Sequence, residues 1–207
     1  MRRTADKQKT TRHRGAGQLR IIGGQLRGRK LAIADLPGLR PTTDRVRETV
    51  FNWLQFELAE QRCLDVFAGT GALGLEALSR GAAEVVMLER NKVAAELLQH
   101  HAMTLNPVCL GQAHVQQADA LKWLQLEATP KPFNVVFVDP PFRSNLAGPA
   151  CALLARNGWL ADDALVYLET EKEWPLDVPT GWQLQREKLA GQVAFRLFTV
   201  TAKGTNT

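Results

Sequence analysis

The sequence predicts an α/β fold in which a mostly parallel, seven-stranded sheet carries helices on both faces. From residue 62 onward, short apolar runs alternate with longer amphipathic segments, a pattern typical of parallel strands joined by helices. Within it, the apolar run 63–67 leads into a glycine turn and then into the helix-forming segment 72–79. Acids recur where successive apolar runs end, at Asp65, Glu89, Asp119 and Asp139. In such a sheet these ends share one edge, where ligands bind.

The composition limits the class of protein. With 207 residues, of which 45% are hydrophobic, the chain can form one sizeable core and a small appendage. No apolar run approaches the roughly 18 residues of a membrane span, and the N-terminus lacks an apolar signal core. We therefore expect a soluble, cytoplasmic monomer without a membrane partner. Cys63, Cys109 and Cys151 lack the spacing of metal ligands, which predicts reduced thiols and no metal site.

Positive charge is concentrated at the N-terminus. Residues 1–47 contain 13 Lys and Arg but 3 Asp and Glu, whereas the remaining 160 residues contain 13 and 18. A basic arm on a mildly acidic body is typical of a nucleic-acid-binding protein. Two other interpretations stay open here: a solvated tail that only aids solubility, and a mitochondrial presequence.

The basic segment divides into a tail and a hairpin. Residues 1–18 are polar without an apolar period, so we expect a disordered tail until it meets a polyanion. The segments 19–22 and 29–33 predict two short strands joined through glycines. This hairpin would lay basic side chains along a phosphate backbone, namely Arg20, Arg27, Arg29 and Lys30.

A helix is expected next, capped by Thr42 or Thr43 and ending near residue 60. Its apolar stripe would face the core and consists of Val46, Val50, Trp53, Leu54 and Leu58. Arg45 and Arg47 fall in the first turns, where the helix dipole favours acids instead. Phosphate contact would explain them, and surface pairing with neighbouring acids would explain them equally well.

The remaining elements follow from apolar periods, caps and turn residues. Strands are expected at 63–67, 84–89, 113–117, 134–138, 164–169, 182–189 and 193–200. Helices are expected at 72–79, 91–104, 120–126 and 146–155. The last two strands flank Gly191 and predict an antiparallel hairpin at the edge of the sheet.

Gly69, Gly71 and Gly74 have the spacing GxGxxG, which is typical of nucleotide-binding turns. A glycine turn without any ligand is the less specific alternative. An NAD-type oxidoreductase would bring a pyrophosphate against these glycines, where the carboxylate of Asp65 would repel it. A cationic ligand without phosphate suits the turn better. S-adenosylmethionine is such a ligand, and Glu89 is well placed to hold its ribose.

The segment Asp139-Pro140-Pro141-Phe142 directly follows the predicted strand 134–138. Proline lacks an N–H donor and fixes φ, so two prolines end the strand in a rigid turn. Such a turn directs the Asp139 carboxylate, the Pro140 carbonyl and the Phe142 ring at one volume. The oxygens can accept hydrogen bonds from an exocyclic amine while the ring stacks on a base. We therefore expect these three residues to be catalytic, with a purely structural turn as the alternative.

These motifs resemble those of the class I S-adenosylmethionine-dependent methyltransferases, which have a Rossmann-like fold. Residues 65–71 resemble motif I of that class, and residues 139–142 resemble the motif (N/D/S)-P-P-(Y/F) of its amino-methylating members. With Leu19-Arg-Ile-Ile-Gly-Gly24 and Arg40-Pro-Thr-Thr-Asp-Arg-Val-Arg-Glu-Thr-Val-Phe-Asn-Trp-Leu54, they are similar to the RsmD family over residues 19–200. That family methylates the exocyclic N2 of one guanine, numbered 966, in 16S ribosomal RNA.

The resemblance implies a role for each matched residue. The implied cofactor-binding residues are Asp65, Phe67, Gly69, Gly71, Glu89, Asp119, Ala120 and Thr43. Asp65, Gly69 and Gly71 would border the methionine part of S-adenosylmethionine. Glu89 would bind the ribose hydroxyls, and Asp119 the adenine amine.

The resemblance also implies a partner, 16S ribosomal RNA within an assembled or partly assembled small subunit, whose target base residues 139–142 would hold. The implied RNA-binding residues are Arg20, Arg27, Arg29, Lys30, Arg45 and Arg47. We accordingly divide the chain into a disordered tail (1–18), an RNA-binding hairpin and helix (19–60) and a catalytic domain (61–203). Asp139 only mildly favours guanine, so an adenine-methylating RNA or DNA enzyme stays open. An oxidoreductase and a non-catalytic RNA-binding module are the rivals from other classes.

Overall fold

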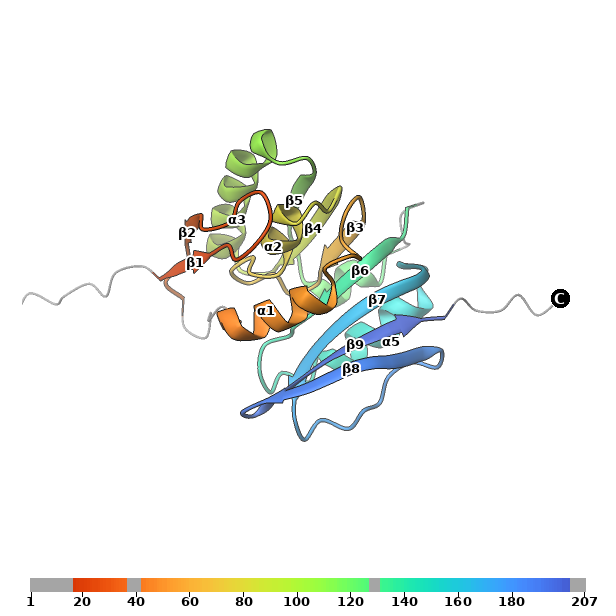
Figure 1. Cartoon of the computed structure of the whole chain (residues 1–207). Coiled ribbons are helices and arrows are strands. Elements are labelled where there is room, and N and C mark those ends of the chain that lie inside the picture. Colours follow the sequence, from red (N-terminus) through yellow and green to blue (C-terminus); the bar gives the residue numbers. More distant parts are fainter. Residues whose placement is uncertain (1–16, 37–41, 127–130, 202–207) are drawn as a thin grey trace, which may run out of the picture.

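The computed structural model describes residues 17–36, 42–126 and 131–201. Within them, a seven-stranded sheet has the order β5-β4-β3-β6-β7-β9-β8 (Figure 1). Its strands are β3 (Arg62–Asp65), β4 (Glu84–Glu89), β5 (Gln112–Gln117), β6 (Phe133–Val138), β7 (Leu160–Glu171), β8 (Trp182–Ala190) and β9 (Val193–Val200). Strands β3 to β7 run parallel, and β9 is antiparallel to both of its neighbours. The predicted parallel sheet with a C-terminal antiparallel hairpin is confirmed.

Helices cover both faces of this sheet. One face carries α1 (Asp44–Trp53), α2 (Gly74–Ser79) and α3 (Lys92–Leu105), and the other carries α4 (Ala120–Leu124) and α5 (Ala147–Arg156) (Figure 1). A short 3-10 helix, Asn106–Val108, follows α3. Successive strand residues point to opposite faces, so β4 contributes Val85 and Met87 to the first core and Val86 and Leu88 to the second.

The N-terminal hairpin forms a separate two-stranded sheet of β1 (Gln18–Arg20) and β2 (Lys30–Ala32). These strands are shorter than predicted, because the regular ladder ends after Arg20: the carbonyl of Ile21 accepts the N–H of Gly28, and the N–H of Arg29 donates to Leu26 within the connecting turn. The N–H of Ile22 donates to the carboxylate of Glu76. The hairpin side chains Leu19 and Leu31 are buried in the same hydrophobic cluster as α1, α2 and α3. The hairpin is therefore packed onto the body of the protein.

Helix α1 ends at Trp53, and the prediction that it continues to about residue 60 is wrong. Beyond it, successive turns carry the chain, and Glu60 has a φ of 64° while its N–H donates to the carbonyl of Gly81 at 2.8 Å. This reversal brings the chain into β3, which a continuing helix could not do. Leu58 lies beyond the helix but is still buried in the core, with 1% exposure. The apolar stripe therefore predicted its burial correctly, although it did not predict the end of the helix.

Other boundaries differ from the prediction as well: β3 ends at Asp65 rather than at residue 67, and α2 begins at Gly74 rather than at residue 72. Strand β7 begins at Leu160 rather than at residue 164, and its pairing with β6 shifts register near its start. Asp162 and Asp163 interrupt the apolar pattern there, so no strand signal precedes residue 164. In the structure Asp163 has a φ of 58°. Helix α4 ends at Leu124, two residues before the predicted end.

Several predictions concern features that the described ranges only partly cover. Among the residues that the structure describes, no helix is long and apolar enough to cross a membrane. The same ranges contain no group of three or more His, Cys, Asp or Glu that could hold a metal ion. The three cysteines all lie within them and are free thiols. The predicted tail 1–18 lies outside them apart from its last two residues.

Candidate functional site

A cavity of about 800 Å³ opens at the carboxyl edge of the parallel strands. The ends of β3 and β4, and the residues that follow β5 and β6, contribute the four predicted strand-end acids to its lining: Asp65, Glu89, Asp119 and Asp139. Other predicted cofactor contacts that line it are Phe67, Gly69, Ala120 and Thr43. Gly71 is not among the lining residues. The structure thus brings together residues that lie up to about half the chain apart, and their ligand contacts stay predictions.

The glycine turn after β3 is held close to the sheet and to α3. Gly71 has a φ of 77°, and a Cβ at this position would lie 2.6 Å from Leu98 Cδ2. A Cβ at Gly74 would lie 2.7 Å from the side chain of Met87 and 3.2 Å from Asp65 Oδ2. A side chain at Gly71 would be strained by the positive φ and would meet Leu98, and a side chain at Gly74 would have to displace Met87, so these glycines let the turn pack closely against α3 and β4.

Asp65 ends β3 and is only 1% exposed. Its Oδ2 accepts the N–H of Gly74 at 2.9 Å, whereas its buried Oδ1 has no hydrogen-bond partner among the described residues. Burial raises the pKa of Asp65 to about 7 and the charge of Glu89 raises it further, whereas the backbone N–H groups of Gly74 and Phe67 lower it. The Phe67 N–H lies near the carboxylate but does not meet the geometry of a hydrogen bond to Oδ1. Asp65 therefore presents an unsatisfied buried acceptor beside the cavity, which suits a ligand that brings N–H donors or positive charge.

Glu89 and Asp119 are fixed by backbone donors. Glu89 Oε2 accepts the N–H of Gly69 at 2.9 Å, and Oε1 accepts the N–H of Asn91 at 2.6 Å. Asp119 is the N-cap of α4, where its Oδ1 accepts the N–H of Lys122 at 3.2 Å. Each carboxylate oxygen has a second lone pair. Both side chains are thus held in place and can still accept hydrogen bonds from hydroxyl or amine groups of a ligand.

The Asp139-Pro140-Pro141-Phe142 turn brings a half-buried carboxylate and an exposed ring to the same cavity. Asp139 Oδ2 accepts the hydroxyl of Thr42 at 3.0 Å, and Phe142 is 53% exposed among the lining residues of the cavity. Burial raises the pKa of Asp139 well above its usual range, and the negative charge of Glu169 raises it further. The Thr42 hydrogen bond acts in the opposite direction.

Sequence reasoning missed two residues of this site, Thr42 and Glu169, both of which line the cavity. The hydroxyl of Tyr167 donates to Glu169 Oε2 at 2.7 Å, and burial raises the pKa of Glu169. Glu169 ends the predicted strand 164–169, so the strand-end pattern could have identified it as a fifth acid. The sequence marked Thr42 only as a helix cap, because its contact with Asp139 joins residues 97 positions apart.

The cavity is strongly acidic. Its lining carboxylates are Asp65, Glu89, Asp119, Asp139, Glu169 and Glu171. Arg90 is the one Lys or Arg among the described residues that line it. A cavity with this charge attracts cations and repels phosphate groups. The structure therefore argues against a pyrophosphate ligand and favours a cationic one.

Comparison with known proteins identifies the family. Residues 19–199 match the protein-family model described as Conserved hypothetical protein 95. Over 197 residues the chain is 53% identical to Ribosomal RNA small subunit methyltransferase D of Escherichia coli K12, covering 95% of this chain and 97% of that protein. The chain belongs to the RsmD family. The resemblance noted from the motifs is confirmed, and with it the methyltransferase class of the enzyme.

Two further comparisons agree. The protein of the same name from Haemophilus influenzae is 48% identical over 183 residues, covering 88% of this chain and 94% of that protein. The solved structure of yhhF from Escherichia coli is 50% identical and covers 90% of this chain and 100% of its own, with a TM-score of 0.82. The methyltransferase fold is thus matched along nearly the whole chain.

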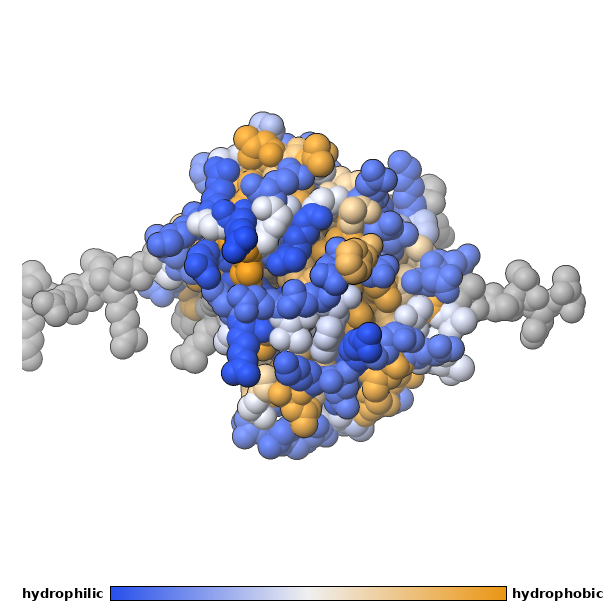
Figure 2. Space-filling model, in the orientation of Figure 1, coloured by the Kyte–Doolittle hydropathy of each residue, from blue (hydrophilic) through white to orange (hydrophobic). Residues whose placement is uncertain are grey.

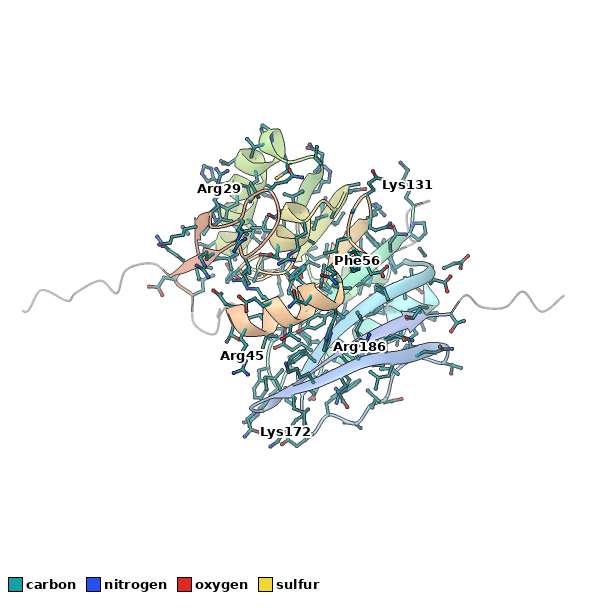
Figure 3. The ribbon with its side chains drawn as sticks, in the orientation of Figure 1. Arg29, Arg45, Phe56, Lys131, Lys172 and Arg186 are labelled. Carbon is teal, nitrogen blue, oxygen red and sulfur yellow. The ribbon has the colours of Figure 1, made fainter. Side chains whose placement is uncertain are left out.

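Most of the basic side chains expected to bind RNA lie on the surface of this RsmD-family protein. Exposed residues of this set are Arg20, Arg27, Arg29, Lys30 and Arg45. Figure 3 shows Arg29 on the hairpin and Arg45 near the start of α1, and Figure 2 shows a largely hydrophilic surface over this part of the molecule. Of these residues, Arg45 is the nearest along the chain to residues that line the cavity, namely Thr42 and Thr43. RNA binding by these residues stays a prediction.

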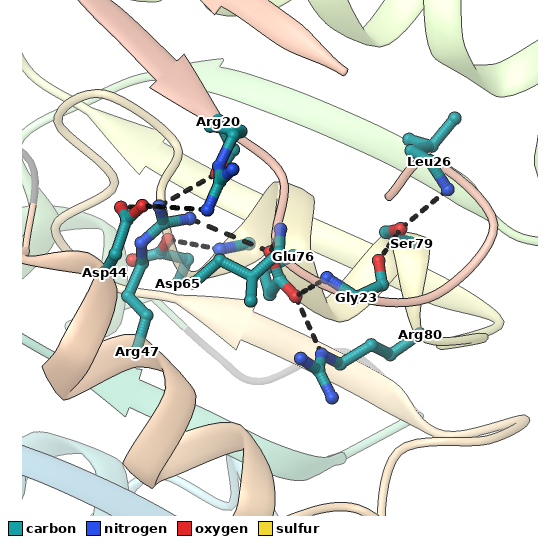
Figure 4. A network of polar contacts seen from close by, with 11 residues as sticks. Arg20, Gly23, Leu26, Asp44, Arg47, Asp65, Glu76, Ser79 and Arg80 are labelled. Carbon is teal, nitrogen blue, oxygen red and sulfur yellow. Dashed lines mark hydrogen bonds and ion pairs between the residues drawn. The ribbon is translucent and has the colours of Figure 1, made fainter. Parts of the chain in front are cut away.

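Arg47 is the exception, and the prediction that it binds RNA is wrong. Its side chain is 1% exposed and donates to the carbonyl of Arg20 at 2.8 Å and to Asp44 Oδ1 at 2.7 Å (Figure 4). Its guanidinium also lies 3.7 Å from the buried carboxylate of Glu76. The sequence did not predict this burial, because Arg47 is charged and the predicted apolar stripe includes its neighbour Val46 but not Arg47 itself.

Glu76 of α2 connects this arginine to the hairpin. Its two oxygens accept the N–H groups of Ile22 and Gly23, each at 2.8 Å, and the Nε–H of Arg80 at 2.8 Å (Figure 4). The side chain is fully buried. The Glu76 network, defined as Glu76 with Arg47, Arg80 and these two N–H groups, therefore anchors the hairpin to α1 and α2.

Proposed function

We propose that this protein transfers a methyl group from S-adenosylmethionine to the exocyclic N2 of one guanine in 16S ribosomal RNA. The target is the guanine numbered 966, presented by an assembled or partly assembled small subunit. The observation that carries the proposal is that a single acidic cavity contains both the strand-end acids and the Asp139-Pro140-Pro141-Phe142 turn. Family membership supports it, because the RsmD relatives are named as methyltransferases of small-subunit ribosomal RNA.

The residues of the cavity fit S-adenosylmethionine. The unpartnered Oδ1 of Asp65 suits an ammonium group, Glu89 suits the ribose hydroxyls, and Asp119 beside Ala120 suits the adenine amine. When bound, the cofactor supplies a methyl group on a sulfonium, which is a good leaving group. Burial raises the pKa of Asp65 and of Asp139, and the positive charge of a bound cofactor would act in the opposite direction and favour their ionised forms.

The acidic lining also decides how RNA approaches. Phosphate groups are repelled from the cavity and attracted to the exposed arginines outside it, so only an uncharged base enters. The target guanine must therefore leave the RNA stack, as bases do when enzymes act on them. Phe142, half exposed among the lining residues, provides a ring on which the base can stack.

Asp139 and the Pro140 carbonyl then act on the amine. Guanine N2 is a weak nucleophile, because its lone pair is delocalised into the ring. Hydrogen bonds to these two oxygens orient the lone pair and stabilise the positive charge that N2 gains as its bond to the methyl carbon forms and the bond from that carbon to sulfur breaks. Asp139, whose burial raises its proton affinity, accepts the proton that N2 releases.

The experiment that tests this function follows a labelled methyl group from S-adenosylmethionine into 16S ribosomal RNA and into small subunits that lack the modification. We expect N2-methylguanosine at one site. In Asp139→Ala the rate should fall by about 10³-fold or more, while the affinity for the cofactor is kept. Asp162→Ala is the matched control, because Asp162 is an exposed acid near the start of β7.

Each other outcome contradicts a specific part of the proposal. Methyladenosine as the product would overturn the base assignment and keep the class of reaction. Transfer that survives in Asp139→Ala would overturn the role of the turn. Absence of transfer to any RNA while the cofactor still binds would overturn the RNA substrate.

A further inference from the structure

Asp139 and Glu169 are neighbours across two parallel strands. The register of β6 and β7 pairs Phe137 with Tyr167 and Val138 with Leu168, so the next pair along is Asp139 with Glu169. Adjacent strands lie about 4.8 Å apart, and paired residues point to the same face. The rings of Phe137 and Tyr167, two residues earlier, confirm this with a centroid distance of 6.3 Å. Both acids line the cavity.

The surroundings of Glu169 leave it short of donors. Tyr167 donates its hydroxyl to Oε2 at 2.7 Å and is itself fully buried. Within the described part of the chain, no Lys, Arg or His forms an ion pair with Glu169 or with Asp139. Two largely buried carboxylates side by side without a cation are costly, and donors from a ligand would offset that cost. Tyr167 orients one oxygen and leaves the other available.

Guanine supplies donors in the required arrangement. Its Watson–Crick edge presents N1–H directly beside the N2 amine, so two adjacent carboxylates can accept from both groups. Adenine has an unprotonated N1, a hydrogen-bond acceptor, which a second carboxylate would repel. Asp139 by itself distinguishes these bases weakly, because both carry an exocyclic amine.

We propose that Glu169 is the residue that selects guanine, accepting the N1–H while Asp139 and the Pro140 carbonyl accept the N2 amine. The proposal rests on the proposed function and assigns base choice to a residue on β7, outside the Asp139-Pro140-Pro141-Phe142 turn. In this arrangement Tyr167 is a positioning residue, since it holds Oε2 and thereby fixes the orientation of the carboxylate. Phe142 can stack on either purine and therefore does not discriminate between them.

The test uses 16S ribosomal RNA joined from synthetic pieces, with guanine or 2-aminopurine at the target position, and reconstituted into small subunits. 2-Aminopurine keeps the exocyclic amine at C2 but has an acceptor at N1. The wild-type protein should prefer guanine by about 100-fold or more in kcat/KM. In Glu169→Gln the amide can donate to the N1 of 2-aminopurine, so transfer to guanine should fall by about tenfold while transfer to 2-aminopurine rises.

The ratio between the two bases separates selection from a merely structural role. If Glu169 only stabilised the fold or the charge of the cavity, both substrates would lose rate equally, and an unchanged ratio in Glu169→Gln would overturn the proposal. Glu173→Gln is the matched control, because Glu173 is exposed and pairs with Lys172. Tyr167→Phe should lower the ratio less than Glu169→Gln does, since the carboxylate stays and loses only its orienting hydrogen bond.

Binding gives a second readout that does not require methyl transfer. The fluorescence of 2-aminopurine reports its stacking in the cavity, and Glu169→Gln should bind this base more tightly than the wild-type protein does. Cofactor affinity of Glu169→Gln, measured in parallel, should match the wild type, and its thermal unfolding temperature should not fall, because the substitution removes the repulsion between two adjacent carboxylates. Absence of transfer by the wild-type protein to the guanine substrate would overturn the proposed function and this inference together, whereas normal transfer with an unchanged ratio overturns the inference alone.

Discussion

Two buried carboxylates, Glu76 and Asp65, differ in how many hydrogen bonds the protein donates to them. Glu76 is fully buried and accepts three hydrogen bonds, from Ile22, Gly23 and Arg80, with a fourth donor group on Arg47 close by. Asp65 is 1% exposed, accepts the N–H of Gly74, and keeps a buried oxygen without a partner among the described residues. One carboxylate is satisfied by the protein, and the other is left for a ligand.

The difference distinguishes a structural acid from a binding acid without reference to sequence motifs. A carboxylate whose lone pairs are all occupied by protein donors stabilises the fold only if those donors stay. A carboxylate with unfilled lone pairs beside a cavity destabilises the empty protein and gains its partners on binding. The first three predictions below test this contrast and the fourth tests the exposed basic surface, from the largest expected effect to the smallest.

Glu76→Gln should destabilise the protein strongly. The amide would turn an N–H group toward the donors that the carboxylate now satisfies and would leave Arg47 buried without its full countercharge. We expect the free energy of unfolding to fall by about 3–5 kcal/mol, measured by urea denaturation. Glu96→Gln, on the exposed surface of α3, is the control and should change it little. Equal stability of the two variants would contradict the structural role.

Asp65→Asn should have the opposite effect on the empty protein. The asparagine oxygen can still accept from Gly74, and the cost of burying a charge disappears. The free energy of unfolding at pH 8 should rise by about 1–3 kcal/mol, because the raised pKa of Asp65 is a stability penalty above that pKa. Affinity for S-adenosylmethionine, measured by calorimetry, should fall by about 10- to 100-fold. A variant that is destabilised and binds normally would contradict the assignment of Asp65 as a binding acid.

Ionisation of Asp65 should therefore lower the stability of the empty protein and raise its affinity for a cationic ligand, so the two quantities should change in opposite directions with pH. Its folded pKa is raised to about 7, so the empty folded protein holds a proton that the unfolded chain releases, and stability falls as pH rises from about 4 to about 7 and then levels off. A cationic ligand needs the ionised form, so binding should tighten with pH, by at most about tenfold per unit, until about pH 7. The difference between the wild type and Asp65→Asn isolates this residue from the other titrating groups. Parallel curves for the two proteins would rule it out as the source.

The exposed basic residues should give the smallest effect. The double variant Arg29→Ala/Lys30→Ala removes two surface charges of the hairpin and leaves the cavity untouched. The slope of log affinity for RNA against log salt should become less steep by about 1.4–1.8 if both contact phosphate. Lys92→Ala, an exposed cation on α3, is the control. An unchanged slope would place the RNA on another surface.

Strand-end acids were predictable because they follow local rules. Apolar runs marked the strands, and the parallel arrangement brought their carboxyl ends, with Asp65 and Asp139, to one edge. The backbone geometry of the glycine turn and of the two prolines was also predictable, because glycine permits positive φ and proline fixes φ wherever each occurs. These features depend on neighbouring residues in the chain, so the sequence alone was sufficient.

The tertiary structure decided what depends on distant partners. Arg47 is buried because Glu76 and the carbonyl of Arg20 meet it from other elements, and nothing in α1 records those partners. Strand order placed β7 beside β6 and thereby put Glu169 next to Asp139, which no local pattern specifies. The sequence by itself determined which acids end strands and which segment forms the turn that receives the base. Only long-range packing decided which charges are satisfied within the protein and which remain available to a ligand, because that choice depends on the donors that the fold brings within reach of each carboxylate.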